Sequence, residues 1–462
     1  MRKIEKRTEI FEQMLVRRAV VSQIVPAIAS QMIALIYNLA DTYFVGMLND
    51  PGQTAAVTVV SASFVMLTAI SNLFGVGGAS LIARYLGRRE EEKARRVAAV
   101  SIWGGAVSAL LFSLLFFAFS EPVLYLCGAT ERTYPIAREY AVWVIIIGGP
   151  ATILNTLLAN LVRAEGNASG ASIGVSLGGV LNTILDPLFV LPGFLGFGAV
   201  GAGMATALSN AAGLIYFIVY MMRRRGVTVI SPEVRYLRDT AFHVREILSI
   251  GFPSAVQYAL TVVAVSAQMN FVSGYDTEAV AALGIVKKLD QLPLYFSIGT
   301  ANGLLPLLAY NHGAGNHWRR REAFWFGSMI SLGFSLACVA AYEIFAPALV
   351  GLFIEDSLTR TYGAAFLRIM VTAMPMMSLC YPMIIQFQAL GRVKESLICS
   401  VLRKGVLDIP LLFLMDSLLP LYGCMMVQPM VDSISLVFCL VFYRRINRET
   451  NTQTESVFRR MN

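Results

Sequence analysis

Long apolar stretches, separated by short polar or basic ones, run along almost the whole chain of 462 residues. Each stretch has about twenty or more residues, the length that an α-helix needs to cross the hydrocarbon layer of a membrane. A membrane β-barrel would instead show alternation within segments of about ten residues. The pattern therefore predicts an all-α polytopic membrane protein with twelve transmembrane helices. They are expected near 19–46, 54–83, 97–120, 137–161, 168–191, 198–222, 247–273, 278–308, 322–347, 362–389, 396–415 and 423–443.

The composition excludes several classes of protein. Hydrophobic residues make up 56% of the chain and charged residues 14%, whereas about a quarter of a soluble domain is charged. The net charge of +8 does not indicate binding to nucleic acid, because the basic residues lie between the apolar stretches. The six cysteines occur singly, and the sequence contains no zinc-protease motif, no P-loop and no serine-hydrolase motif. We therefore expect neither an enzyme nor a cofactor.

Basic residues are distributed unevenly between the two sides of the predicted membrane. Of the 37 Lys and Arg residues, 31 fall in the N-terminal segment, the alternate loops and the C-terminal tail, and three (Arg132, Arg138 and Arg360) fall in the opposite loops. Cytoplasmic loops carry the excess of positive charge. We therefore expect a multi-pass protein of the cell membrane with both termini in the cytoplasm. The first apolar stretch is too long for a cleaved signal peptide, so it is expected to stay in place as a signal anchor.

The two halves of the sequence resemble one another. Pro26 recurs as Pro253 and Gly166 as Gly391, at spacings of 227 and 225 residues. Each half has six predicted helices, so the two halves start with the same orientation and are related by a pseudo-two-fold axis along the membrane normal. The predicted organisation is a cytoplasmic segment (1–18), a six-helix bundle (19–222), a cytoplasmic linker (223–246), a second six-helix bundle (247–443) and a cytoplasmic tail (444–462). Two bundles joined by a linker are typical of a secondary transporter, with substrate sites between the bundles.

Charged residues within membrane helices are costly and are retained mainly where they function or pair. Asp41 in the first helix, Asn182 and Asp186 in the fifth and Thr206 in the sixth are predicted to lie at similar depth in the N-terminal half. Asn182 and Asp186 share one helix face because they are four residues apart. Oxygen ligands of this kind suit Na⁺, and two neighbouring carboxylates can also share a proton. The alternative is a structural network of buried hydrogen bonds.

The C-terminal half has a different set of polar residues. Lys287 and Asp290 are three residues apart and either pair with each other or line a central cavity, and the roles of Asp408 and Asp432 stay open between packing and function. The candidates for the substrate cavity are Gln31, Gln257, Gln268, Lys288 and Asp290.

Several segments together resemble the multidrug and toxic compound extrusion family. They are YNLADTYFVG (37–46), GVGGAS (75–80), RAEGN (163–167), NTILDP (182–187) and GAGMAT (201–206). The resemblance covers about 15–445 and is specific because these segments occur in order on a repeat of six plus six helices. It is strongest to the prokaryotic branch that has an Asp pair in the N-terminal bundle.

This resemblance implies the efflux of organic, often cationic or amphipathic compounds in exchange for H⁺ or Na⁺. In that branch the cation is held by the residues that match Asp41, Asn182, Asp186 and Thr206, with a Tyr that matches Tyr37 nearby. The implied partners are small-molecule drugs and the lipid bilayer, and we expect a monomer. Two rivals are a flippase for lipid-linked precursors in the same superfamily and a membrane-embedded enzyme. The first tends to have extra helices and a strongly cationic cavity, and the second needs a nucleophile or paired acidic motifs that the sequence does not show.

Overall fold

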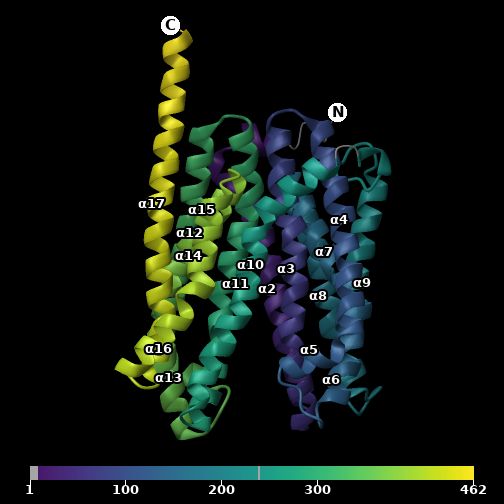
Figure 1. Ribbon diagram of the computed structural model, residues 1–462, viewed down its shortest axis with the longest axis vertical. Coiled ribbons are helices and arrows are strands. Elements are labelled where there is room, and N and C mark those ends of the chain that lie inside the picture. Colours follow the sequence, from purple (N-terminus) through teal and green to yellow (C-terminus); the bar gives the residue numbers. More distant parts are fainter. Residues whose placement is uncertain (1–8, 238–239, 462) are drawn as a thin grey trace.

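Twelve helical segments of membrane-spanning length follow one another in residues 9–237 and 240–461, the parts of the chain that the computed structural model describes (Figure 1). In the first half they are α2 (Val16–Gly46), α3 (Pro51–Gly87), α4 (Glu91–Ala118), α6 and α7 (Tyr134–Ala141 and Gly149–Ala164, joined by the π-helix η2, Val142–Ile147), α8 (Ala168–Val190) and α9 (Gly198–Arg223). In the second half they are α10 (Thr240–Ser273), α11 (Thr277–Gly313), α12 (His317–Gly351), α13 and α14 (Ser357–Val371 and Met374–Ala389), α15 and α16 (Val393–Val401 and Asp408–Leu418, joined by η4, Leu402–Val406) and α17 (Tyr422–Met461). The short elements are the π-helix η1 (Glu9–Gln13), α5 (Ser120–Leu126) and the 3₁₀-helix η3 (Val234–Tyr236).

The lengths and hydropathy of these helices agree with the predicted membrane protein. In the described ranges, nine single helices are long and apolar enough to span a membrane, and two further spans are pairs bent by 44°, α6–η2 with α7 and α13 with α14. The eleventh segment, expected as one helix over 396–415, is not among these spans and is interrupted at η4, where Lys404 and Gly405 have non-helical backbone angles. Arg403 and Lys404 therefore belong to a broken helix and not to a loop, as the count of basic loop residues had assumed.

Asparagine and aspartate side chains define where several helices begin. Asp50 accepts a hydrogen bond from the Gly52 N–H at 2.8 Å, and Pro51 follows it at the first helical position of α3. Asn167 caps α8 through the Gly170 N–H at 3.1 Å, and Asn316 caps α12 through the Arg319 N–H at 3.1 Å. Such caps satisfy backbone donors that the first turn of a helix leaves free. They fix the short turns that force consecutive helices to run antiparallel.

The two halves bend and turn at equivalent places. The bend before α7 falls at Gly149–Pro150 and the bend before α14 at Met374–Pro375, 225 residues later. Both breaks carry a proline at the start of the second helix, where its missing N–H costs no hydrogen bond. The turns after α7 and α14 contain Gly166 and Gly391 at φ of 84° and 72°, a backbone conformation that favours glycine. These shared features agree with the predicted pseudo-two-fold relation.

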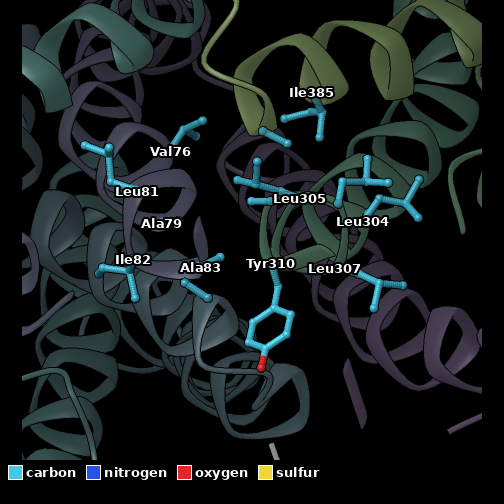
Figure 2. Close-up of a cluster of buried hydrophobic side chains, with 14 of the residues drawn as sticks. Val76, Ala79, Leu81, Ile82, Ala83, Leu304, Leu305, Leu307, Tyr310 and Ile385 are labelled. Carbon is cyan, nitrogen blue, oxygen red and sulfur yellow. The ribbon is translucent and has the colours of Figure 1, made fainter. Parts of the chain in front are cut away.

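The hydrophobic cores show how the halves are joined. One core contains residues from both halves, including Phe74 and Leu81 of α3 and Leu304 and Tyr310 of α11, and Figure 2 shows part of it. The second core lies wholly within residues 45–202 and the third wholly within 272–431. The shared core is at the end of the molecule where Figure 1 marks both termini, and the separate cores are at the opposite end. The halves are therefore joined at the terminal-bearing end and separate at the other.

Two helix crossings make most of the contact between the halves. Helix α2 packs against α8 in its own half and against α11 in the other half. Helix α10 of the second half packs against α15 in its own half and against α3 in the first half. A helix that contacts both halves transmits a change in one half to the other. The position of α2 between α8 and α11 is important for the site described next.

Candidate functional site

Asn182 joins two other polar side chains in the interior of the first half. Its Nδ2 donates to Asp186 Oδ1 at 3.1 Å along α8 and lies 3.4 Å from Thr206 Oγ1 on α9. Asp186 is completely buried, and Asn182 and Thr206 are buried as well. The four-residue spacing puts Asn182 and Asp186 on the same face of α8, and the close packing of α8 with α9 brings Thr206 to them.

The same region of α8 has a helix irregularity. Pro187 lies inside the helix directly after Asp186. Because proline has no N–H, the carbonyl oxygen four residues earlier, that of Thr183, lacks its usual helical donor. A free backbone carbonyl is a further oxygen that a cation can use.

Asp41 and Tyr37 approach this group from α2. The Tyr37 ring packs against Gly179 of α8, where the absence of a side chain leaves room for it. The carboxylates of Asp41 and Asp186 are close enough to interact electrostatically, and each interacts with the Tyr37 hydroxyl. The structure thus brings Tyr37, Asp41, Asn182, Asp186 and Thr206 into one group contributed by three helices.

Three oxygen atoms of this group have no hydrogen-bond donor among the described residues. They are Asp41 Oδ1, Asn182 Oδ1 and Asp186 Oδ2, and all three are buried. A buried acceptor without a donor is costly, and it usually indicates a bound water, ion or proton. Within the described chain, no cluster of three or more His, Cys, Asp and Glu side chains could hold a metal ion. This group has two carboxylates and takes its other oxygens from an amide and a hydroxyl, which are hard ligands suited to Na⁺.

Tyr140 also belongs to this region, although no pattern in the sequence points to it. It lies on α6, is buried, and interacts electrostatically with both Asp41 and Asp186. Its ring packs against Gly203 of α9. Tyrosine is common in apolar helices, so only the packing of α6 against α9 reveals the proximity of Tyr140.

The residues expected to line the substrate cavity lie in different places. Gln257 lines a cavity of about 40 Å³ between the halves, together with Asn72, Tyr258 and Gln388. Gln268 donates from Nε2 to the Cys424 carbonyl oxygen at 2.8 Å and borders a smaller cavity inside the second half.

Gln31 on α2 and Asp290 on α11 are half-buried. Lys288 on α11 is exposed, while its neighbour Lys287 borders the smaller cavity with Lys404 and Asp408.

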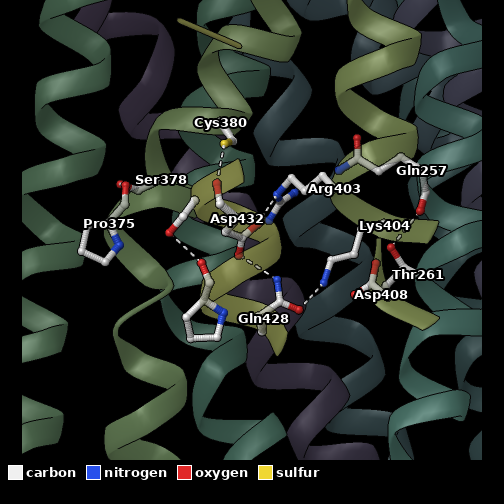
Figure 3. Close-up of polar contacts among 12 residues, drawn as sticks. Gln257, Thr261, Pro375, Ser378, Cys380, Arg403, Lys404, Asp408, Gln428 and Asp432 are labelled. Carbon is white, nitrogen blue, oxygen red and sulfur yellow. Dashed lines mark hydrogen bonds and ion pairs between the residues drawn. The ribbon is translucent and has the colours of Figure 1, made fainter. Parts of the chain in front are cut away.

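A chain of polar contacts surrounds the break between α15 and α16 (Figure 3). Arg403 Nε donates to Asp432 Oδ1 at 2.9 Å, and both side chains are completely buried. Gln428 donates to Asp432 Oδ2 at 2.7 Å and accepts from Lys404 Nζ at 2.7 Å. The Gly405 N–H donates to Asp408 at 2.8 Å. Asp432 is therefore the centre of an ion-paired network and not an isolated buried acid.

Comparisons with known proteins agree with the repeat and the fold. The family model described as MatE matches residues 26–188 and again residues 253–414. The multidrug export protein MepA of Staphylococcus aureus (strain MRSA252) is 28% identical over 449 residues, which are 97% of this chain and 98% of that protein. The MepA protein of Staphylococcus saprophyticus is also 28% identical, over 446 residues, covering 96% of this chain and 97% of the relative.

Solved structures show the same fold. A multidrug resistance MATE family transporter of the MOP superfamily, in an outward-facing conformation, superposes with a TM-score of 0.90 at 23% identity. The alignment covers 97% of this chain and 99% of that one. A MATE structure in the straight conformation gives the same TM-score at 24% identity.

Proposed function

Because the chain belongs to the MatE family of multidrug and toxic compound extrusion transporters, we propose that it exports organic, often cationic or amphipathic compounds in exchange for H⁺ or Na⁺. The family has transporters and not enzymes, and the relatives named above are multidrug export proteins. The observation that carries the proposed ion coupling is the group of buried oxygens at Asp41, Asn182 and Asp186 for which the described part of the chain offers no hydrogen-bond donor. We propose that transport needs the coupling ion, H⁺ or Na⁺, and no cofactor.

The direction in which the structure opens follows from the charge asymmetry. Without Arg403 and Lys404, which lie in the broken helix, 29 of the 31 basic residues remain in the segments expected on the side of the termini, and this excess indicates that the side faces the cytoplasm. The halves share a core at this end and have separate cores at the other, so the space between them opens outward. The protein is then a monomeric, multi-pass transporter of the cell membrane in its outward-facing state.

In this state the ion reaches Asp41 and Asp186 from outside. A proton or Na⁺ supplies the positive charge that balances two neighbouring carboxylates. The lone pairs of the buried oxygens then have a bound ion or proton as their partner. Binding removes the repulsion between the carboxylates of Asp41 on α2 and Asp186 on α8, and so changes the position of α2. Because α2 also packs against α11, the change reaches the other half. The ion must bind the two facing states with different affinity, and this difference drives drug release and reorientation.

Dye efflux from proteoliposomes under separately imposed pH and Na⁺ gradients tests the proposal. We expect efflux with at least one gradient, and we expect Asp41→Asn and Asp186→Asn to abolish it while each variant still elutes as a folded monomer. Asp408→Asn is the matched control, because Asp408 is also a buried carboxylate but lies in the second half and accepts a backbone hydrogen bond that Asn can keep. Unchanged efflux in both N-terminal variants would contradict the site. Binding of a lipid-linked precursor without any dye efflux would instead favour a flippase.

A further inference from the structure

The short π-helix η1, which precedes the first membrane helix, lies across the join between the two halves. Its Phe11 is completely buried, with its ring centroid 4.7 Å from that of Tyr310 on α11. On the other side the Phe11 ring packs against Gly166, in the turn between α7 and α8. One side chain of η1 therefore contacts both halves at once.

Glu12 makes the same kind of bridge with polar contacts. Its carboxylate accepts two hydrogen bonds from Arg89, at 2.8 and 2.9 Å, just after the end of α3 in the first half. It also accepts a hydrogen bond from the Tyr310 hydroxyl in the second half, at 2.7 Å. Separating the two halves at this end would break one set of these bonds, because a single carboxylate cannot follow both partners.

Arg319 on α12 holds the backbone of the same segment. Its guanidinium donates to the carbonyl oxygens of Phe11 at 2.7 Å, Ile10 at 3.2 Å and Met14 at 2.5 Å. Arg319 itself is buried. The end of a helix leaves its last carbonyl groups without a helical donor, and a buried guanidinium with several donors satisfies such groups here.

We propose that residues 9–14 form a latch that holds the terminal-bearing end closed in the outward-facing state and detaches when that end opens. This inference rests on the alternating access of the proposed function. The contacts supply the reason: Phe11, Glu12 and the carbonyl groups bind surfaces from α3, the α7–α8 turn, α11 and α12, which lie together only while the halves are joined. Phe11, Glu12 and Arg319 act in this latch by holding the two halves together. They make no contact with the proposed cation site around Asp41 and Asp186.

The test measures populations of the two states in the full-length protein in lipid nanodiscs. Spin labels are introduced through an unnatural amino acid at Glu92 and Ala314, which are exposed at the terminal-bearing end in the first and second half. We expect Glu12→Ala and Arg319→Met each to raise the ratio of open to closed distances at this end about tenfold, which corresponds to about 1.4 kcal/mol. The matched controls Glu9→Ala and Arg321→Met alter exposed residues of the same two elements and should leave the ratio unchanged.

A second measurement needs no mutation and covers the case in which a variant does not fold. Hydrogen exchange of the backbone amides of residues 9–15 is followed in the wild-type protein under drug and ion conditions that favour either facing state. We expect faster exchange when the terminal-bearing end is open. Equal exchange in both states, or an unchanged distance ratio in folded Glu12→Ala and Arg319→Met, would overturn the latch while wild-type efflux still occurs. Absence of wild-type efflux would instead count against the proposed function.

Discussion

Arg403 and Asp432 form an ion pair at 2.9 Å in which neither side chain is exposed. The guanidinium carbon of Arg403 also lies 4.1 Å from the centroid of the Tyr381 ring. Gln428 donates a hydrogen bond to the second carboxylate oxygen of Asp432. Removing one partner of a buried pair leaves an uncompensated charge, which costs about 3–5 kcal/mol. We therefore expect Arg403→Met to lower the thermal unfolding midpoint of the purified protein in detergent by several degrees.

The double variant Arg403→Met with Asp432→Leu separates pairing from packing. Replacing both charges by apolar groups of similar size is often neutral for stability. The double variant should therefore unfold at a temperature closer to the wild type than the single variant does. A double variant that is less stable than Arg403→Met would show that Asp432 has a role apart from this pair.

Gly251 of α10 lies against the backbone of Leu73 of α3 at the crossing between the halves. A Cβ atom at this position would overlap the Leu73 carbonyl oxygen, which is rigid backbone. We expect Gly251→Ala to push α10 away from α3 at a cost of about 1–3 kcal/mol, the usual range for overpacking. Gly333→Ala on α12 is the control, because that position has open space around it. A thermal unfolding midpoint of Gly251→Ala equal to that of Gly333→Ala would contradict a tight crossing.

Thr206 tests how many oxygen atoms belong to the proposed cation site formed by Asp41, Asn182, Asp186 and Thr206. Its hydroxyl oxygen lies 3.4 Å from the Asn182 amide, and Thr206→Val removes this oxygen without changing the shape of the side chain. Loss of one oxygen ligand should weaken ion binding, so the ion concentration that half-saturates efflux should rise about tenfold, which corresponds to about 1.4 kcal/mol. Thr206→Ser keeps the oxygen and should stay close to the wild type. Equal values for the two variants would remove Thr206 from the group.

The sequence predicted most of the fold because membrane helices need long apolar stretches, and these are visible without any packing information. It also predicted that Asn182 and Asp186 share a helix face, since this depends only on their spacing. The break at Lys404 and Gly405 was not predicted, because an apolar run in the sequence does not show where a helix unwinds. Two charged residues there looked like the end of a loop, while their partners Asp432 and Gln428 are more than twenty residues away.

Contacts between distant segments were the other part that the sequence could not supply. Glu12 is 298 residues from Tyr310, and no local pattern connects them. The same holds for Tyr140, which joins the cation group only through the packing of α6 against α9. The roles of Asp41 and Asp186 in ion coupling stay a prediction, and the efflux experiment decides them.

The linker between the halves is attached to the first half through Glu165. This buried carboxylate accepts hydrogen bonds from the Thr228 hydroxyl at 2.8 Å and from the Val229 N–H, and Trp103 donates to the Pro232 carbonyl oxygen at 2.9 Å. Exposed arginines on both sides of this attachment make the linker a substrate for trypsin once it detaches. Each lost bond to a charged group favours detachment by about 1.5–3 kcal/mol, so Glu165→Ala should be cleaved at least about tenfold faster.

The measurement is the rate at which trypsin converts the chain into two fragments of nearly equal size on a gel. Glu92→Ala is the control, because Glu92 is exposed at the same end and its pair with Arg96 is a surface ion pair that contributes little to stability. Faster cleavage of the linker should come from local detachment and not from global unfolding of the protein. Cleavage within the membrane helices of Glu165→Ala should therefore stay as slow as in the wild type. If Glu165→Ala and Glu92→Ala are cleaved at the same rate, the linker is held by Trp103 and its apolar neighbours, and the carboxylate contributes no measurable attachment.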